Sequence, residues 1–173
     1  MATACLVACS SGGSGTAGGQ PSTTVVAVPV APEGFTTVKI RVVAPDGTVV
    51  ERCVLVADSD ALRGRGLMGV TDPALGGIDA MVFTYDRAST SGFWMKNTLV
   101  PLSIAFADEG GTVTFTADME PCPAGTDPCP VTTPPSAFRV AVEVPKGRLA
   151  DLGLVPGGRI EIVTGTGCAV GRA

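Results

Sequence analysis

Short runs of β-branched residues, each ended by a turn sequence, limit the fold of this 173-residue chain more than any other feature. The first two runs, 36–43 and 48–56, flank Ala-Pro-Asp-Gly, a sequence typical of a turn. Comparable runs predict further strands at 80–85, 92–96, 99–107, 112–118, 138–144 and 159–163. About seven or eight short strands with few helical residues predict a mainly β domain, arranged as a compact, partly closed β-barrel.

Two short helices are predicted between these strands. Asp58, Ser59 and Asp60 are residues that favour a helix N-cap, so a helix is expected to begin at about Ala61. A second helix is predicted over 148–152, ending at Gly153, because glycine commonly follows the last helical residue. So little helix disfavours a βαβ nucleotide-binding fold.

The N-terminal residues differ from the rest in composition and indicate a targeting signal followed by a tether. Leu6-Val7-Ala8-Cys9 resembles a bacterial lipobox, in which the cysteine becomes the lipid-bearing N-terminus; the alternative is an ordinary low-complexity tail with a chance cysteine. Only eight residues precede Cys9 and none is charged, which indicates a truncated leader. We therefore expect an exported protein, anchored outside the cytoplasm to the cell membrane through lipidated Cys9. The expected organisation is a signal remnant (1–9), a Gly/Ser/Pro tether (10–35), a β-rich domain (36–168) and a tail (169–173).

The chain contains no histidine, and this absence excludes many kinds of catalytic site. It rules out Ser-His-Asp and Cys-His nucleophile systems and every His-ligated metal site. The net charge is −4 and no basic cluster occurs, so nucleic-acid binding is not expected. No cofactor is expected.

Four cysteines lie in the predicted domain, and two disulfides are favoured over a four-thiolate metal site. Zinc sites prefer closely spaced cysteine pairs, which the spacing here does not provide. Cys122 and Cys129 flank a short Pro-rich loop and form the natural local pair. The remaining pair, Cys53 and Cys168, would tie the ends of the domain together. No metal site is expected.

Five separated motifs resemble the bacterial and archaeal domain-of-unknown-function family 192. They cover about 49–162 and comprise Arg-Gly-Leu-Met at 65–68, Met-Val-Phe at 81–83, Phe-Trp-Met-Lys-Asn-Thr at 93–98 with Pro-Leu at 101–102, Glu-Pro-Cys at 120–122 with Cys129, and the segment 143–159. The hexapeptide is the most specific of them. The resemblance implies a small, β-rich, often exported domain, and it implies no established reaction.

The hexapeptide at 93–98 carries the candidate binding residues. In an extended segment Trp94, Lys96 and Thr98 share one face, opposite the face of Asn97. An indole beside an ammonium can hold an anionic or sugar-like ligand, and Arg65 on a Gly-flanked turn can add a second cationic contact. The alternative, which is favoured, makes Trp94 a core anchor with Lys96 extending past it and Asn97 capping a turn.

These patterns favour a non-catalytic binding module for a small, anionic or saccharide ligand. One alternative is a His-independent enzyme that acts on an envelope polymer through carboxylates, which requires two carboxylates in a cleft, one with a raised pKa. The other is a scaffold for a second envelope protein, which requires an exposed apolar patch. Three methionines, Met68, Met81 and Met95, are interpreted as core residues, with a Cu(I) site as the alternative.

Overall fold

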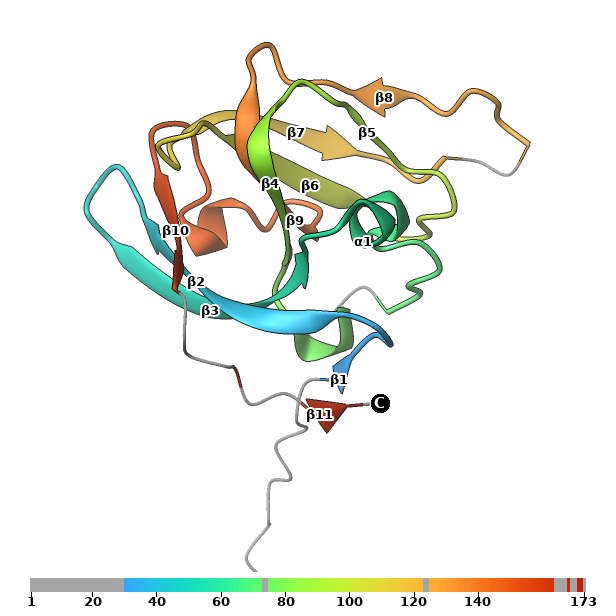
Figure 1. The fold of residues 1–173 in the computed structure, drawn as a ribbon, viewed down its shortest axis with the longest axis horizontal. Helices are drawn as coiled ribbons and strands as arrows, with labels where there is room; N and C mark the ends of the chain where they lie inside the picture. The colour runs from blue at the N-terminus through green and yellow to red at the C-terminus, as the bar shows by residue number, and fades with distance from the viewer. Residues whose placement is uncertain (1–29, 73–74, 123–124, 164–167, 169–170, 173) are drawn as a thin grey trace, which may run out of the picture.

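The chain is described by a computed structural model that covers residues 30–72, 75–122, 125–163, 168 and 171–172. Seven strands form one sheet in the order β10-β2-β3-β4-β9-β6-β7 (Figure 1). All neighbours in this sheet are antiparallel except β3 and β4, which are parallel. The strands are β2 (Thr36–Val43), β3 (Val49–Ala57), β4 (Met81–Ser89), β6 (Leu102–Ala107), β7 (Val113–Met119), β9 (Phe138–Pro145) and β10 (Arg159–Val163).

The sheet does not close into a barrel, so the predicted partly closed β-barrel is corrected to a large open mixed sheet. The edge strands β10 and β7 meet only near one end, where Val113 N–H donates to the Gly158 carbonyl at 2.8 Å and Ile160 N–H donates to the Gly111 carbonyl at 2.8 Å. Gly111 has φ +81°, and a Cβ there would lie 2.4 Å from the Ile160 carbonyl oxygen, so only glycine permits this approach. Beyond this point β10 pairs with β2 alone, and no continuous ladder joins the two edges.

Only one α-helix is formed among the described residues, not the two that were predicted. It is α1 (Asp60–Arg65), whose N-cap Ser59 accepts a hydrogen bond from Leu62 N–H. The second predicted helix is a single 3₁₀ turn, η2 (Ala150–Leu152), ended by Gly153 at φ +71°. Its hydrogen bond runs from Leu152 N–H to the Leu149 carbonyl, three residues back, which is the spacing of a 3₁₀ turn and not the four-residue spacing of an α-helix. A further 3₁₀ turn is η1 (Leu75–Gly77).

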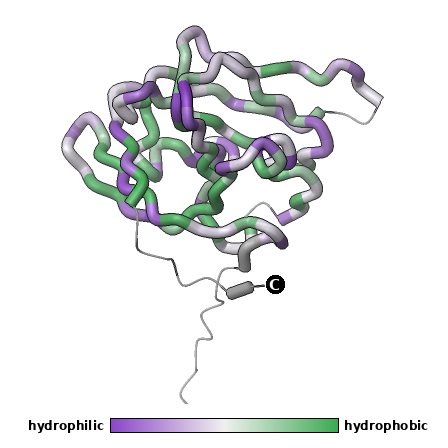
Figure 2. The backbone as a smooth tube through the Cα atoms, in the orientation of Figure 1, coloured by the Kyte–Doolittle hydropathy of each residue, from purple (hydrophilic) through white to green (hydrophobic). Residues whose placement is uncertain are grey.

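Two apolar cores lie on opposite faces of the sheet, because successive side chains of a strand point to opposite faces. On β4, Met81 and Phe83 belong to the first core and Val82 belongs to the second. In Figure 2 apolar and hydrophilic segments alternate along the strands. The short pair β5 (Phe93–Trp94) and β8 (Val131–Thr132) adds to the first core, where the Phe93 ring lies 5.0 Å from that of Phe83.

Segments next to the predicted domain also take part in the fold. β1 (Val30–Ala31) pairs in parallel with β11 (Gly171–Arg172), below the main sheet in Figure 1. Phe35, within the expected tether, is buried in the first core. The lipobox residue Cys9 and the expected signal remnant lie outside the described residues.

Both predicted disulfides are confirmed. Cys53 bonds to Cys168 and Cys122 bonds to Cys129. Their presence suggests that the domain matures in an oxidising, extracytoplasmic setting. Within the ranges that the structure describes, no helix has the length and apolar character needed to cross a membrane.

Candidate functional site

A cavity of about 300 Å³ opens beside α1, where this helix approaches β4, β5 and β9. Its volume falls at the lower end of the range for small-molecule sites. The residues that line it combine aromatic rings, glycine backbone, hydroxyls and charged groups: Asp60, Arg63, Gly64, Arg65, Gly66, Met68, Phe83, Tyr85, Ser91, Gly92, Phe93, Trp94, Thr98 and Glu143.

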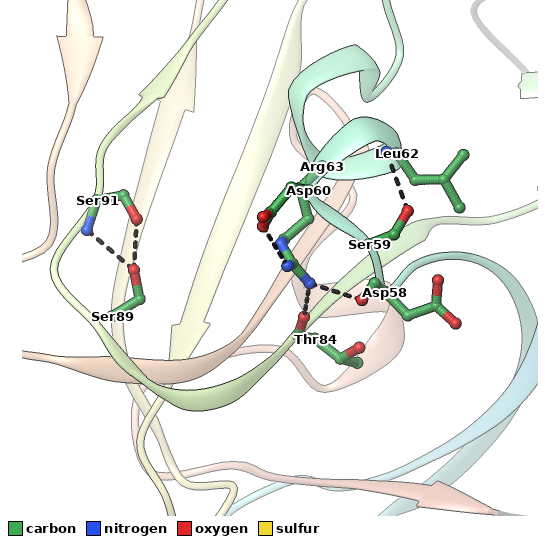
Figure 3. A network of polar contacts seen from close by, with 8 residues as sticks. All are labelled: Asp58, Ser59, Asp60, Leu62, Arg63, Thr84, Ser89 and Ser91. Carbon is green, nitrogen blue, oxygen red and sulfur yellow. Dashed lines mark hydrogen bonds and ion pairs between the residues drawn. The ribbon is translucent and has the colours of Figure 1, made fainter.

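One side of the cavity is fixed by Arg63, which ties α1 to the sheet (Figure 3). Its guanidinium donates to the carbonyls of Asp58 at 2.8 Å and Thr84 at 2.6 Å, and it forms an ion pair with Asp60 at 2.6 Å. The same group lies 4.8 Å from the centre of the Tyr85 ring. These contacts use most of the donors of Arg63, so its role here is to position α1 and Asp60.

The lining residues differ sharply in exposure, which defines a closed end and a mouth. Glu143 and Thr98 are each only 5% exposed, and Phe83 is fully buried. Trp94, in contrast, is 51% exposed, and Arg65 lies at the surface. The polar groups at the closed end are therefore a carboxyl and a hydroxyl, and an indole and a guanidinium stand at the mouth.

Glu143 is the chemically unusual residue of the site. On β9 it is paired in register with Met81 of β4 and Ile104 of β6, both fully buried. Burial among apolar neighbours raises the pKa of its carboxyl from 4.5 to about 8, because the charged form is poorly solvated there. At neutral pH the group is therefore mostly protonated and can donate a hydrogen bond. Burial is also the main cause that raises the pKa of neighbouring Tyr85.

The charges at the mouth are predominantly positive. Asp60 and Arg63 offset each other, whereas Arg65 packs its guanidinium 4.1 Å from the centre of the Phe35 ring and donates to a backbone carbonyl. The Lys96 ammonium lies 5.9 Å from the centre of the Trp94 ring. Because Glu143 is mostly neutral at pH 7, these two cations give the mouth a net positive field.

The structure brings together three of the five predicted binding residues. Arg65, Trp94 and Thr98 line the cavity, and Lys96 stands beside Trp94 without lining it. Asn97 is exposed with φ +56°, and its carbonyl accepts from Gly69 N–H at 2.9 Å. The favoured interpretation of Trp94 as a core anchor is wrong, because half of its surface is exposed.

Residues outside the hexapeptide were missed or assigned differently. Glu143 was missed as a site residue; its only signal is a single acid within the apolar run Phe-Arg-Val-Ala-Val-Glu-Val. Of the three methionines, Met81 and Met95 are buried in the first core and Met68 lines the cavity. Among the described residues, no group of three or more carboxylate or thiol side chains is placed to hold a metal ion.

The open mixed sheet and the cavity beside α1 define a mainly β domain with one partly buried polar site. A family model, DUF192 (Uncharacterized ACR), matches residues 41–162, most of the chain. The chain therefore belongs to this uncharacterised family, as its motifs predicted.

Two crystal structures resemble the fold. One, of a candidate transcription regulator from Sinorhizobium meliloti 1021, has a TM-score of 0.63 at 23% identity and covers 74% of this chain and 95% of its own. The other is of a protein of unknown function from Novosphingobium aromaticivorans DSM 12444 and has a TM-score of 0.63 at 27% identity. This match covers 87% of the present chain and 99% of the other protein. No functionally curated protein is detectably similar in sequence.

Proposed function

We propose that this chain is a non-catalytic module that binds a small saccharide or anionic ligand in the cavity beside α1. One observation carries the proposal: a cavity of about 300 Å³ joins exposed Trp94 and Arg65 to the buried polar groups of Thr98 and Glu143. Binding sites commonly combine an apolar wall with a few convergent polar groups in this way.

The two ends of the cavity suit different parts of such a ligand. A sugar ring can stack on the indole of Trp94, and an anionic substituent can pair with Arg65 and Lys96 at the mouth. The buried hydroxyl of Thr98 and the carboxyl of Glu143 can bond to ligand hydroxyls, since each can donate and accept. The volume suits a monosaccharide more than a long polymer.

We also propose that the module acts outside the cytoplasm, tethered to the membrane through lipidated Cys9. Two disulfides support the oxidising compartment, and the Ser/Gly-rich composition of the sequence after Cys9 is typical of a tether. Metabolic labelling with a fatty-acid analogue tests the anchor. Label that persists in a Cys9→Ser variant would contradict it.

Calorimetric titration with glucose, glucose 6-phosphate and glucuronate tests binding. We expect the charged sugars to bind more tightly than glucose, and Trp94→Ala to weaken all of them by roughly fivefold to tenfold. Arg65→Ala should weaken only the charged sugars. Arg148→Ala is the matched control, since this exposed arginine lies outside the cavity. Equal heats for wild type and Trp94→Ala would contradict the proposal.

A second candidate function is favoured by the pair of carboxylates in the same cavity. Glu143 is mostly protonated at neutral pH, and Asp60 is held by Arg63. A buried protonated acid together with a second carboxylate is the pattern of a glycoside-cleaving site. Binding is preferred because Asp60 is fully exposed at the mouth. Release of nitrophenol from aryl glycosides by wild type, abolished in Glu143→Gln, would reverse this preference.

A further inference from the structure

Two deeply buried polar side chains of the cavity lack a partner within the protein. Neither the Thr98 hydroxyl nor the Glu143 carboxyl forms a side-chain hydrogen bond or ion pair with another described residue, although each residue is 95% buried or more. Among the described residues no fully buried side-chain nitrogen or oxygen is left without a hydrogen bond, so these two unpaired groups are reached through the cavity that both residues line. Their hydrogen-bonding capacity is therefore open to a molecule that enters the cavity, and we expect a ligand to use it.

The surroundings of Glu143 specify the chemistry of that partner. Aromatic rings of Phe83, Phe93 and Tyr85 line the same cavity, and no cation of the protein pairs with the carboxyl. Rings present a negative face to a cation, and a carboxylate supplies the opposite charge. Carboxylate and rings together are a common setting for an organic ammonium group.

We infer that the ligand of this cavity carries an ammonium group that pairs with the Glu143 carboxylate between the aromatic rings. The inference rests on the proposed function and narrows it from saccharides in general to amino sugars. The anionic substituent of the ligand then points to the mouth, towards Arg65 and Lys96. Such a ligand has opposite charges at its two ends, matching the buried acid and the exposed bases.

The other charged groups at the cavity do not oppose this arrangement. On α1, Arg63 is offset by its 2.6 Å ion pair with Asp60, and Arg65 is held at the surface against Phe35. On β4, Tyr85 stays neutral, since burial raises the pKa of its hydroxyl. An ammonium group that enters the closed end therefore meets one titratable partner, Glu143.

Four related sugars separate this inference from the proposed function: glucose, glucosamine, glucose 6-phosphate and glucosamine 6-phosphate. Calorimetry at pH 6.5, where the amines are protonated, measures affinity. Repeating it in buffers of different ionisation enthalpy measures the protons released. We expect glucosamine 6-phosphate to bind at least about tenfold more tightly than glucose 6-phosphate. It should also release close to one more proton, because the Glu143 carboxyl ionises when the ammonium binds.

Glu143→Gln should remove both the amine preference and the extra proton, so that this variant binds glucosamine 6-phosphate no more tightly than glucose 6-phosphate. Glu33→Gln, at an exposed glutamate outside the cavity, is the matched control and should change neither. Binding of both phosphates with equal affinity and equal proton release overturns the inference and leaves the proposed function standing. Failure of all four sugars to bind at millimolar concentration overturns both.

Discussion

Replacing Glu143 by glutamine should make the protein more stable at alkaline pH and nearly unchanged at acid pH. The carboxyl has a pKa of about 8 in the folded protein and about 4.5 when exposed by unfolding. Between these values the folded state binds the proton and the unfolded state does not. The free energy of unfolding therefore falls as pH rises through this window, by about 1.4 kcal/mol per unit at most.

The expected size follows from the two pKa values. Between pH 5 and pH 8 the contribution of Glu143 should decline by roughly 3–4 kcal/mol, a large part of the stability of a small domain. Glutamine has nearly the same shape and does not titrate, so Glu143→Gln should lose this slope. Urea unfolding of both proteins, followed by circular dichroism at pH 5, 6, 7 and 8, gives the difference at each pH.

Taking the difference in the free energy of unfolding between variant and wild type removes the contribution of all other titrating groups. The matched control is Glu33→Gln, at an exposed position, which should follow wild type at every pH. A Glu143→Gln curve parallel to wild type from pH 5 to pH 8 would refute the reasoning. It would mean that the carboxyl is well solvated, and the cavity would lose its distinctive group.

Two further predictions concern the framework of the cavity. Removing the Cys53–Cys168 disulfide, which spans 115 residues, should lower the free energy of unfolding by about 5 kcal/mol through loop entropy. Removing the Cys122–Cys129 disulfide, which spans 7 residues, should lower it by about 2 kcal/mol. Urea unfolding of the paired serine variants measures both effects. Gly92→Ala should destabilise the protein by roughly 1–3 kcal/mol, because its Cβ would lie 2.2 Å from Val131 Cγ1 and force β8 away from β5. Equal costs for the two disulfides, or a neutral Gly92→Ala, would contradict these expectations.

Most strands could be predicted because local pattern and final fold agree. The predicted strands 36–43 and 159–163 match β2 and β10 residue for residue, and 138–144 differs from β9 by one residue. The sheet order could not be predicted, because it depends on long-range pairings such as the parallel contact of β3 with β4. Whether the edges close also depends on one tight approach at Gly111, which no strand pattern encodes.

The candidate site was predicted only in part, because local sequence patterns do not show where a strand ends or which strands pair. Alternation put Trp94, Lys96 and Thr98 on one face, but the strand ends at Trp94 and a turn follows, in which Thr98 N–H donates to the Met95 carbonyl at 3.1 Å. Thr98 is therefore buried while Lys96 stays outside. Glu143 could not be recognised, since only the pairing of β9 with both neighbours shows that an isolated acid is enclosed.

A comparison of buried polar residues separates structure from function in this domain. Ser103 is as buried as Glu143, yet its hydroxyl donates to Asp118 at 2.5 Å and accepts from Gly147 N–H at 2.8 Å, so the fold itself accounts for it. Glu143 lacks such partners and lowers stability as pH rises. An apolar residue there would remove this cost, so packing alone does not explain the acid. The carboxyl and the Thr98 hydroxyl line the same cavity, where the ligand proposed above would bond to both groups.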